Sequence, residues 1–250
     1  MLEQAAEAAA NALRRGGKLA YVGAGSSGLM ALSDSLELAG TFGILPERTP
    51  MLFAGGAAAL LHMVGAVEDD LTLARADFNA AGLTKGDVAI CLSASGTTPY
   101  ALEVAALCRA VGATVAGIAN VAGSALLQAA DLPILLDTGP EVVNGSTRMG
   151  AATAQKVALN MISVLVGIRL GHVHDGYMVN VVADNAKLRD RAGRIVSALS
   201  GEGTEAALAA LQATGGAVKP AILVARGRSV AEAAGDLTAS GGHLAPWLKR

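Results

Sequence analysis

The chain has 250 residues, of which 52% are hydrophobic and 16% are charged, and its net charge is −2. This length predicts one main domain with a small appendage, and the apolar fraction supplies a large core. The small net charge gives no support to nucleic-acid binding, which needs a concentrated basic face. Two cysteines are too few for a disulfide framework and fit a reducing cytoplasm. The alanine-rich opening with Glu3 and Glu7 is not typical of a signal peptide.

Apolar strands alternate with helices along the first half of the chain. We expect helices over 2–15, 26–39, 57–67, 71–80, 99–110 and 124–129, and strands over 18–22, 50–53, 87–92, 114–118 and 132–136. This alternation predicts a three-layer α/β fold with a parallel sheet, in which ligands bind at the carboxyl ends of the strands. Turn residues interrupt the long uncharged runs 49–67 and 110–130, so we interpret both as buried strands and helices rather than membrane spans.

The second half of the chain is helical in pattern. Segment 152–168 is apolar on nearly every face, which predicts a buried helix. Either the sheet and a second subunit cover it, or it is the core helix of a monomer, and we favour the dimer. Beyond Ser200, short helices are expected over 204–213, 217–225 and 229–238. We therefore divide the chain into a main domain, 1–200, and a small helical unit, 201–250, with no catalytic residues in the latter.

Two loops rich in Gly and Ser directly follow predicted strands, at 23–28 and at 93–99. Each has the order strand, tight turn, helix start, and a helix N-terminus with neighbouring hydroxyls binds phosphate well. The pair therefore indicates a phosphorylated small molecule. We assign phosphate contacts in the second loop, and phosphate or sugar contacts in the first, to the following residues: Ser93, Ser95, Gly96, Thr97, Thr98, Ser26 and Ser27.

Longer motifs surround these loops: Gly65-Ala-Val-Glu68-Asp69, Gly139-Pro-Glu141-Val-Val-Asn-Gly-Ser-Thr-Arg-Met149, Thr153-Ala-Gln-Lys156, Leu159-Asn-Met161 and the segment 178–188. With the two loops they resemble the N-acetylmuramic acid 6-phosphate etherases of the sugar-isomerase (SIS) domain superfamily, which also holds the glucokinase regulatory proteins. The resemblance runs from about Ala12 to the C-terminus. It implies that residues 1–200 form a SIS domain, and that 201–250 form a three-helix unit similar to ubiquitin-associated domains.

The resemblance implies a carbon–oxygen lyase. That family cleaves the C3 lactyl ether by elimination across C2–C3 and addition of water, which gives N-acetylglucosamine 6-phosphate and D-lactate in cell-wall sugar recycling. It uses no metal or organic cofactor. Glu37 and Glu68 match its catalytic pair, so Glu68 is expected to remove the C2 proton and Glu37 to protonate the leaving oxygen. Glu141 either contacts the sugar or caps a helix. A cytoplasmic homodimer is implied.

Three positions depart from the family pattern. Leu29, Thr97 and Gly150 stand where the family usually carries basic residues, which weakens the expected hold on phosphate and on the lactyl carboxylate. Two alternatives therefore stay open: an aldose–ketose isomerase of another phosphosugar, and a non-catalytic sensor of a sugar phosphate. Retention of both glutamates favours elimination.

The pair His172 and His174 superficially suggests a metal site. No third ligand is spaced to complete the coordination, so we predict no bound metal.

Overall fold

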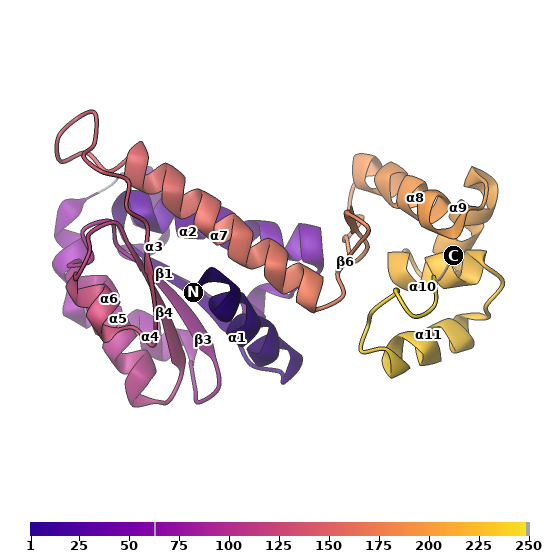
Figure 1. Ribbon diagram of the computed structural model, residues 1–250, viewed down its shortest axis with the longest axis horizontal. Coiled ribbons are helices and arrows are strands. Elements are labelled where there is room, and N and C mark those ends of the chain that lie inside the picture. Colours follow the sequence, from indigo (N-terminus) through magenta and orange to yellow (C-terminus); the bar gives the residue numbers. More distant parts are fainter. Residues whose placement is uncertain (63, 249–250) are drawn as a thin grey trace. The chain divides into compact units, whose positions relative to one another are not determined.

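The computed structural model describes residues 1–62 and 64–248, and it confirms the α/β fold with a parallel sheet (Figure 1). The sheet has five strands in the order β2-β1-β3-β4-β5, and all its neighbours pair in parallel. The strands are β1 (Leu19–Gly23), β2 (Met51–Phe53), β3 (Val88–Leu92), β4 (Thr114–Ala119) and β5 (Leu132–Leu135). The chain passes from β1 to β2 at one edge of the sheet and then to β3 on the other side of β1. The direction of winding therefore reverses between β1 and β3.

The chain divides into two compact units. The first comprises Met1–Leu36 and Leu45–Val166, and the second comprises Glu37–Ile44 and Gly167–Arg250. The sheet and the helices that cover it belong to the first unit. Its helical elements are α1 (Leu2–Arg14), most of α2 (Gly25–Phe42), η1 (Pro46–Arg48), α3 (Gly56–Leu61), η2 (Gly65–Asp69), α4 (Leu71–Ala81), α5 (Pro99–Ala110), α6 (Ala125–Ala129) and most of α7 (Gly150–Arg169).

Alternating strand residues supply the two faces of the sheet, and helices cover both (Figure 1). Ala20, Val22 and Cys91 pack in a core with side chains of α4, α5 and α6. On the opposite face, the Tyr21 hydroxyl donates to Asp34 of α2 at 2.7 Å. The Asp34 carboxylate also accepts from Asn160 and Ser163 of α7, at 2.6 and 2.9 Å. This buried network holds α2 and α7 side by side over β1.

One predicted helix is broken in the structure. Where the pattern predicts a single helix over 57–67, α3 ends at Leu61 and the 3-10 turn η2 begins at Gly65. Residue 63, which falls within the predicted helix, lies outside the described residues. The break matters because η2, and not a longer α3, carries Glu68. Glycine is unfavourable in a helix interior, so a single helix that continued through Gly65 would be destabilised.

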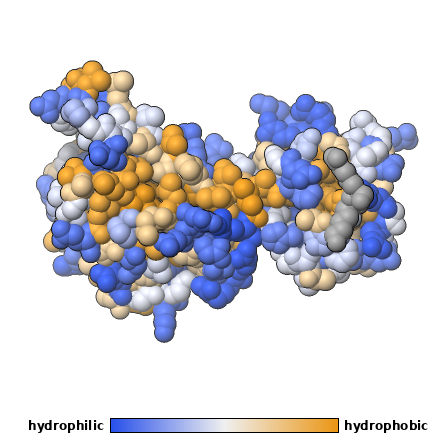
Figure 2. All heavy atoms as spheres, in the orientation of Figure 1, coloured by the Kyte–Doolittle hydropathy of each residue, from blue (hydrophilic) through white to orange (hydrophobic). Residues whose placement is uncertain are grey.

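Helix α7 is only half covered by its own chain. Residues such as Leu159 and Ile162 are buried, whereas an apolar stripe stays exposed: Val157, Met161, Val164 and Ile168. This exposure argues against the alternative of a core helix buried within one chain, and the second subunit that would cover the stripe stays a prediction. Figure 2 shows apolar atoms gathered along this helix. By length and composition α7 could also span a bilayer, and half of its apolar window is buried in the protein.

The second unit is a small helical body with its own core. After the hairpin β6 (Val173–His174) and β7 (Tyr177–Met178) come α8 (Ala186–Ser200), α9 (Thr204–Ala213), α10 (Val218–Ala225) and α11 (Val230–Ala239). The sequence-based boundary after residue 200 differs from the structural one at 166–167. The reason is α8, whose Ile195 and Val196 pack with Leu211 and Ile222 of the following helices. The sequence pattern had not assigned α8 as an element of this unit.

Candidate active site

A cavity of about 320 Å³ opens in the first unit, within the range of small-ligand sites. The loops that follow β1 and β3 both contribute to it, so it lies at the carboxyl ends of the two strands between which the winding reverses. That is where doubly wound α/β sheets bind ligands. Its lining residues are Ala24, Gly25, Ser26, Ser27, Phe53, Ala54, Ala59, Val64, Gly65, Val67, Glu68, Ala94, Ser95, Thr98 and Thr147.

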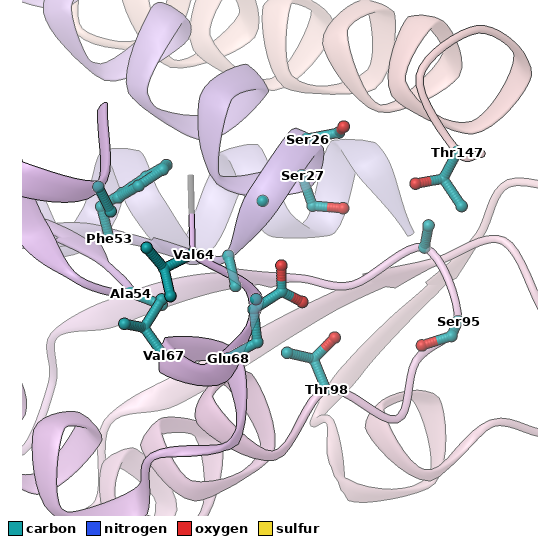
Figure 3. A pocket seen from close by; sticks show the side chains of 15 residues that line it. Ser26, Ser27, Phe53, Ala54, Val64, Val67, Glu68, Ser95, Thr98 and Thr147 are labelled. Carbon is teal, nitrogen blue, oxygen red and sulfur yellow. The ribbon is translucent and has the colours of Figure 1, made fainter. Parts of the chain in front are cut away.

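The lining has a hydroxyl side and an apolar side (Figure 3). The hydroxyl side consists of Ser26, Ser27, Ser95, Thr98 and Thr147, which surround a common space, and the apolar side consists of Phe53, Ala54, Val64 and Val67. Glu68 lies between the two sides. Helices α2 and α5 begin at this cavity, at Gly25 and at Pro99, and their N-terminal amides and dipoles favour an anion beside the hydroxyls.

The loop after β3 is organised around one buried hydroxyl. The Ser93 Oγ accepts from the Gly96 amide at 3.0 Å and lies 2.8 Å from the Thr98 hydroxyl. Ser93 is 2% exposed and does not line the cavity, and neither do Gly96 and Thr97. Of the five residues predicted in this loop, the structure therefore presents Ser95 and Thr98 to the cavity, while Ser93 holds the loop in shape.

Glu68 is the carboxylate of the cavity. A Cβ added at Gly25 would lie 2.7 Å from the Glu68 Oε1, and Gly25 has a φ of +53°. Glycine at this position therefore permits the turn and leaves room for the carboxylate. Burial, together with the charge of the neighbouring Asp69, raises the pKa of Glu68. A raised pKa suits a carboxylate that must take up a proton near neutral pH.

Glu37 does not line this cavity. It is exposed, and it lies in the part of α2 that belongs to the second unit. Glu37 stands 12 residues after Gly25 in α2, and a helix advances about 1.5 Å per residue, so about 18 Å along the helix axis separates the two positions. Sequence matching cannot detect this separation, because a motif fixes spacing along the chain and not position in space.

Glu141 also lies outside the cavity, and the helix-capping alternative describes it. Its two carboxylate oxygens accept from the Gly150 and Ala151 amides, at 2.9 and 2.8 Å, at the first turn of α7. These backbone bonds lower the pKa of Glu141. Thr147, from the same motif, lines the cavity and was not among the predicted site residues. The signal that could have found it is a hydroxyl residue in the segment that precedes α7.

Among the described residues that line the cavity there is no Lys, Arg or His. The positions Leu29, Thr97 and Gly150, where basic residues were expected from the family pattern, do not line it either. In the second unit, His172 is mostly buried, and burial lowers its pKa to about 4 with help from the charge of Lys219. That imidazole is therefore neutral at physiological pH.

The chain is similar to known proteins along nearly its whole length. A family model described as SIS domain matches residues 1–120. The N-acetylmuramic acid 6-phosphate etherase of Deinococcus radiodurans is 47% identical over 243 residues, which cover 97% of this chain and 80% of the relative. The etherase of that name from Streptomyces coelicolor is 44% identical, over 96% of this chain and 78% of the relative.

The fold has counterparts among solved structures. A crystal structure of a candidate phosphosugar isomerase involved in capsule formation, from Bacteroides fragilis, aligns with a TM-score of 0.54 and 21% identity. The alignment covers 70% of this chain and 82% of the other, and at that identity it supports the fold alone. The sequence similarity to the etherases is much higher, because identity above 40% extends over almost all of this chain and most of each relative. By that measure the chain belongs to the N-acetylmuramic acid 6-phosphate etherase family.

Proposed function

We propose that this protein is an N-acetylmuramic acid 6-phosphate etherase, which releases D-lactate and leaves N-acetylglucosamine 6-phosphate. The observation that carries the proposal is the position of Glu68, a half-buried carboxylate of raised pKa beside a hydroxyl-lined cavity at two helix N-termini. Elimination of this kind needs a base next to an anchored phosphosugar, and the cavity offers both.

The proposed substrate has a phosphate at one end and an apolar acetamido methyl group, and the two sides of the lining can bind them separately. The phosphate goes to the hydroxyl side, where Ser95, Thr98 and the α5 N-terminus can donate hydrogen bonds. The acetamido methyl then faces Phe53 and Val67, which cover it from water. This orientation leaves the C2–C3 bond beside Glu68, between the two sides.

Glu68 takes the C2 proton, the C3–O bond breaks, and the lactate oxygen leaves with a proton from an acid. Water then adds its hydroxyl group to C3 and a proton to C2, so the net reaction is hydrolysis of the ether. The supporting feature for Glu68 as the base is its raised pKa, since a base with a pKa closer to neutral takes up the proton more readily. No step here requires a metal or an organic cofactor.

We assign the acid to Glu37 of a second copy in a cytoplasmic homodimer. Glu37 is exposed, and its neighbour Leu36 is 70% exposed although it is apolar. Val157, Met161 and Val164 of α7, which packs against α2 through Asp34, are exposed too. A second copy packed on these exposed apolar residues would cover them, and because Glu37 directly follows Leu36, it would bring a Glu37 to the interface.

The test is lactate release by the purified protein, followed by mixing of two variants. We expect Glu37→Gln and Glu68→Gln each to be inactive as homodimers. When co-expressed, they should recover about a quarter of the wild-type activity, because half of the dimers then hold one intact composite site. No recovery would assign both glutamates to one chain or exclude Glu37. Interconversion of aldose and ketose phosphates without lactate would instead support an isomerase.

A further inference from the structure

The Gly139–Met149 motif supplies a third segment to the cavity, besides the two loops recognised from the sequence. Thr147 lines the cavity with Ser26, Ser27, Ser95 and Thr98. In Figure 3 the Thr147 side chain lies on the hydroxyl side of the cavity, with its oxygen turned toward the two serines of α2. The hydroxyls therefore come from three separate stretches of chain, which together can surround a tetrahedral anion.

The first turn of α7 shows how Thr147 is held. The first amide groups of a helix have no partner within the helix. In α7, Glu141 accepts from Gly150 and Ala151, and the Thr147 carbonyl accepts from the Ala152 amide at 3.0 Å. The Met149 carbonyl accepts from Thr153, also at 3.0 Å. With these four donors satisfied, the N-terminus of α7 is stabilised by the protein itself rather than by a ligand.

The two hydrogen bonds of Glu141 connect the start of segment 141–149 to the first turn of α7. Glu141 precedes Gly150 by a stretch of exposed residues in which Val142 is 83% exposed and Val143 is 65% exposed. Such a stretch has little buried apolar surface to fix it, so its position depends on polar contacts at its ends. The carboxylate of Glu141 provides two of them, a few residues from Thr147.

We propose that Thr147 binds the substrate phosphate through its hydroxyl, and that Glu141 is the positioning residue that keeps Thr147 in the cavity. This inference rests on the proposed function for the identity of the phosphosugar. It assigns Glu141 a role without substrate contact, unlike the sugar contact that the family resemblance left open.

The experiment measures KM and kcat for lactate release, together with the inhibition constant of inorganic phosphate. Thr147→Val keeps the shape of the side chain and removes the hydroxyl, so we expect both KM and the inhibition constant to rise about tenfold, with little change in kcat. Thr147→Ser should restore both constants. The matched control is Ser146→Ala, because Ser146 contacts Arg148 and does not line the cavity. An unchanged KM, or a raised KM with an unchanged phosphate constant, would overturn the phosphate contact.

The role of Glu141 is tested by a double-mutant cycle. Glu141→Gln keeps one oxygen acceptor but turns a carboxamide NH2 donor toward the helix amides, so it should raise KM in the otherwise wild-type protein. In the Thr147→Val background it should raise KM no further, while the melting temperature falls equally in both backgrounds. An equal rise of KM in both backgrounds would show that Glu141 acts on the substrate itself.

The failure of the two proposals can be told apart. If the wild-type protein releases no lactate, the proposed function fails. Calorimetric binding of N-acetylglucosamine 6-phosphate to the wild-type protein and to Thr147→Val then still decides the role of Thr147.

Discussion

The loops after β1 and β3 occupy equivalent places in the sheet but are built differently. The β3 loop is fixed by its own side chains, since Ser93 Oγ accepts from the Gly96 amide and contacts Thr98. In the β1 loop, the glycine backbone lies close to neighbouring side chains. A Cβ at Gly28 would lie 2.7 Å from the Phe53 ring, and one at Gly25 would meet Glu68. A loop held by internal hydrogen bonds is a rigid anion holder, whereas a loop held by glycine packing leaves space for a reacting carboxylate.

This difference predicts that changes in the β1 region reduce kcat and that changes in the β3 loop raise KM. The largest effect should come from Glu68→Gln, which keeps the shape and removes the base. We expect lactate release to fall by about a thousandfold, the size typical of general base catalysis. Calorimetric binding of N-acetylglucosamine 6-phosphate should change little. Retained activity in this variant would remove Glu68 from the mechanism.

Gly25→Ala should give the next largest effect. The added Cβ would push on the Glu68 Oε1 at 2.7 Å, and the φ of +53° is unfavourable for alanine. We expect kcat to fall by one to two orders of magnitude, because misplacing a base by a small distance has a large effect. Gly40→Ala is the control in the same helix, since nothing lies within 4 Å of its Cβ position. Equal kinetics for both variants would contradict the packing argument.

Gly96→Ala tests the β3 loop. Gly96 has a φ of +68°, and an added Cβ would overlap the Ser124 side chain, so the loop must shift. We expect KM to rise about tenfold with a smaller change in kcat, because the shift moves Ser95 and Thr98 away from the phosphate. Steady-state kinetics measure both constants. A loss confined to kcat would show that the two loops do not divide their roles in this way.

The smallest effect concerns pH. Asp69 raises the pKa of Glu68, after burial, so Asp69→Asn should lower that pKa. The base works when deprotonated, so kcat/KM falls as the pH drops through the pKa of Glu68. In the variant this acid limb should therefore move to lower pH. The profile of kcat/KM against pH measures the shift. A shift to higher pH would mean that Asp69 does not act on Glu68 through its charge.

The local sequence determined much of the fold. Apolar runs and the turn residues between them located all five strands of the sheet to within about two residues, as expected for buried parallel strands. They also predicted α5 with its observed bounds, Pro99–Ala110, because proline favours the first turn of a helix. Loop chemistry indicates Ser26, Ser27, Ser95 and Thr98, and the family resemblance indicates Glu68; the structure brings all five to one cavity.

Tertiary structure decided the remainder, because it depends on which segments meet in space. Glu37 lies too far along α2 to line the cavity of its own chain, and Glu141 caps α7 because it accepts two hydrogen bonds from its first amides. Thr147 enters the cavity only because α7 begins beside it. Likewise, α8 joins the second unit through contacts with later helices. Periodicity encodes which face of an element is apolar, but it does not encode which partner covers that face or where a polar side chain finds its acceptor.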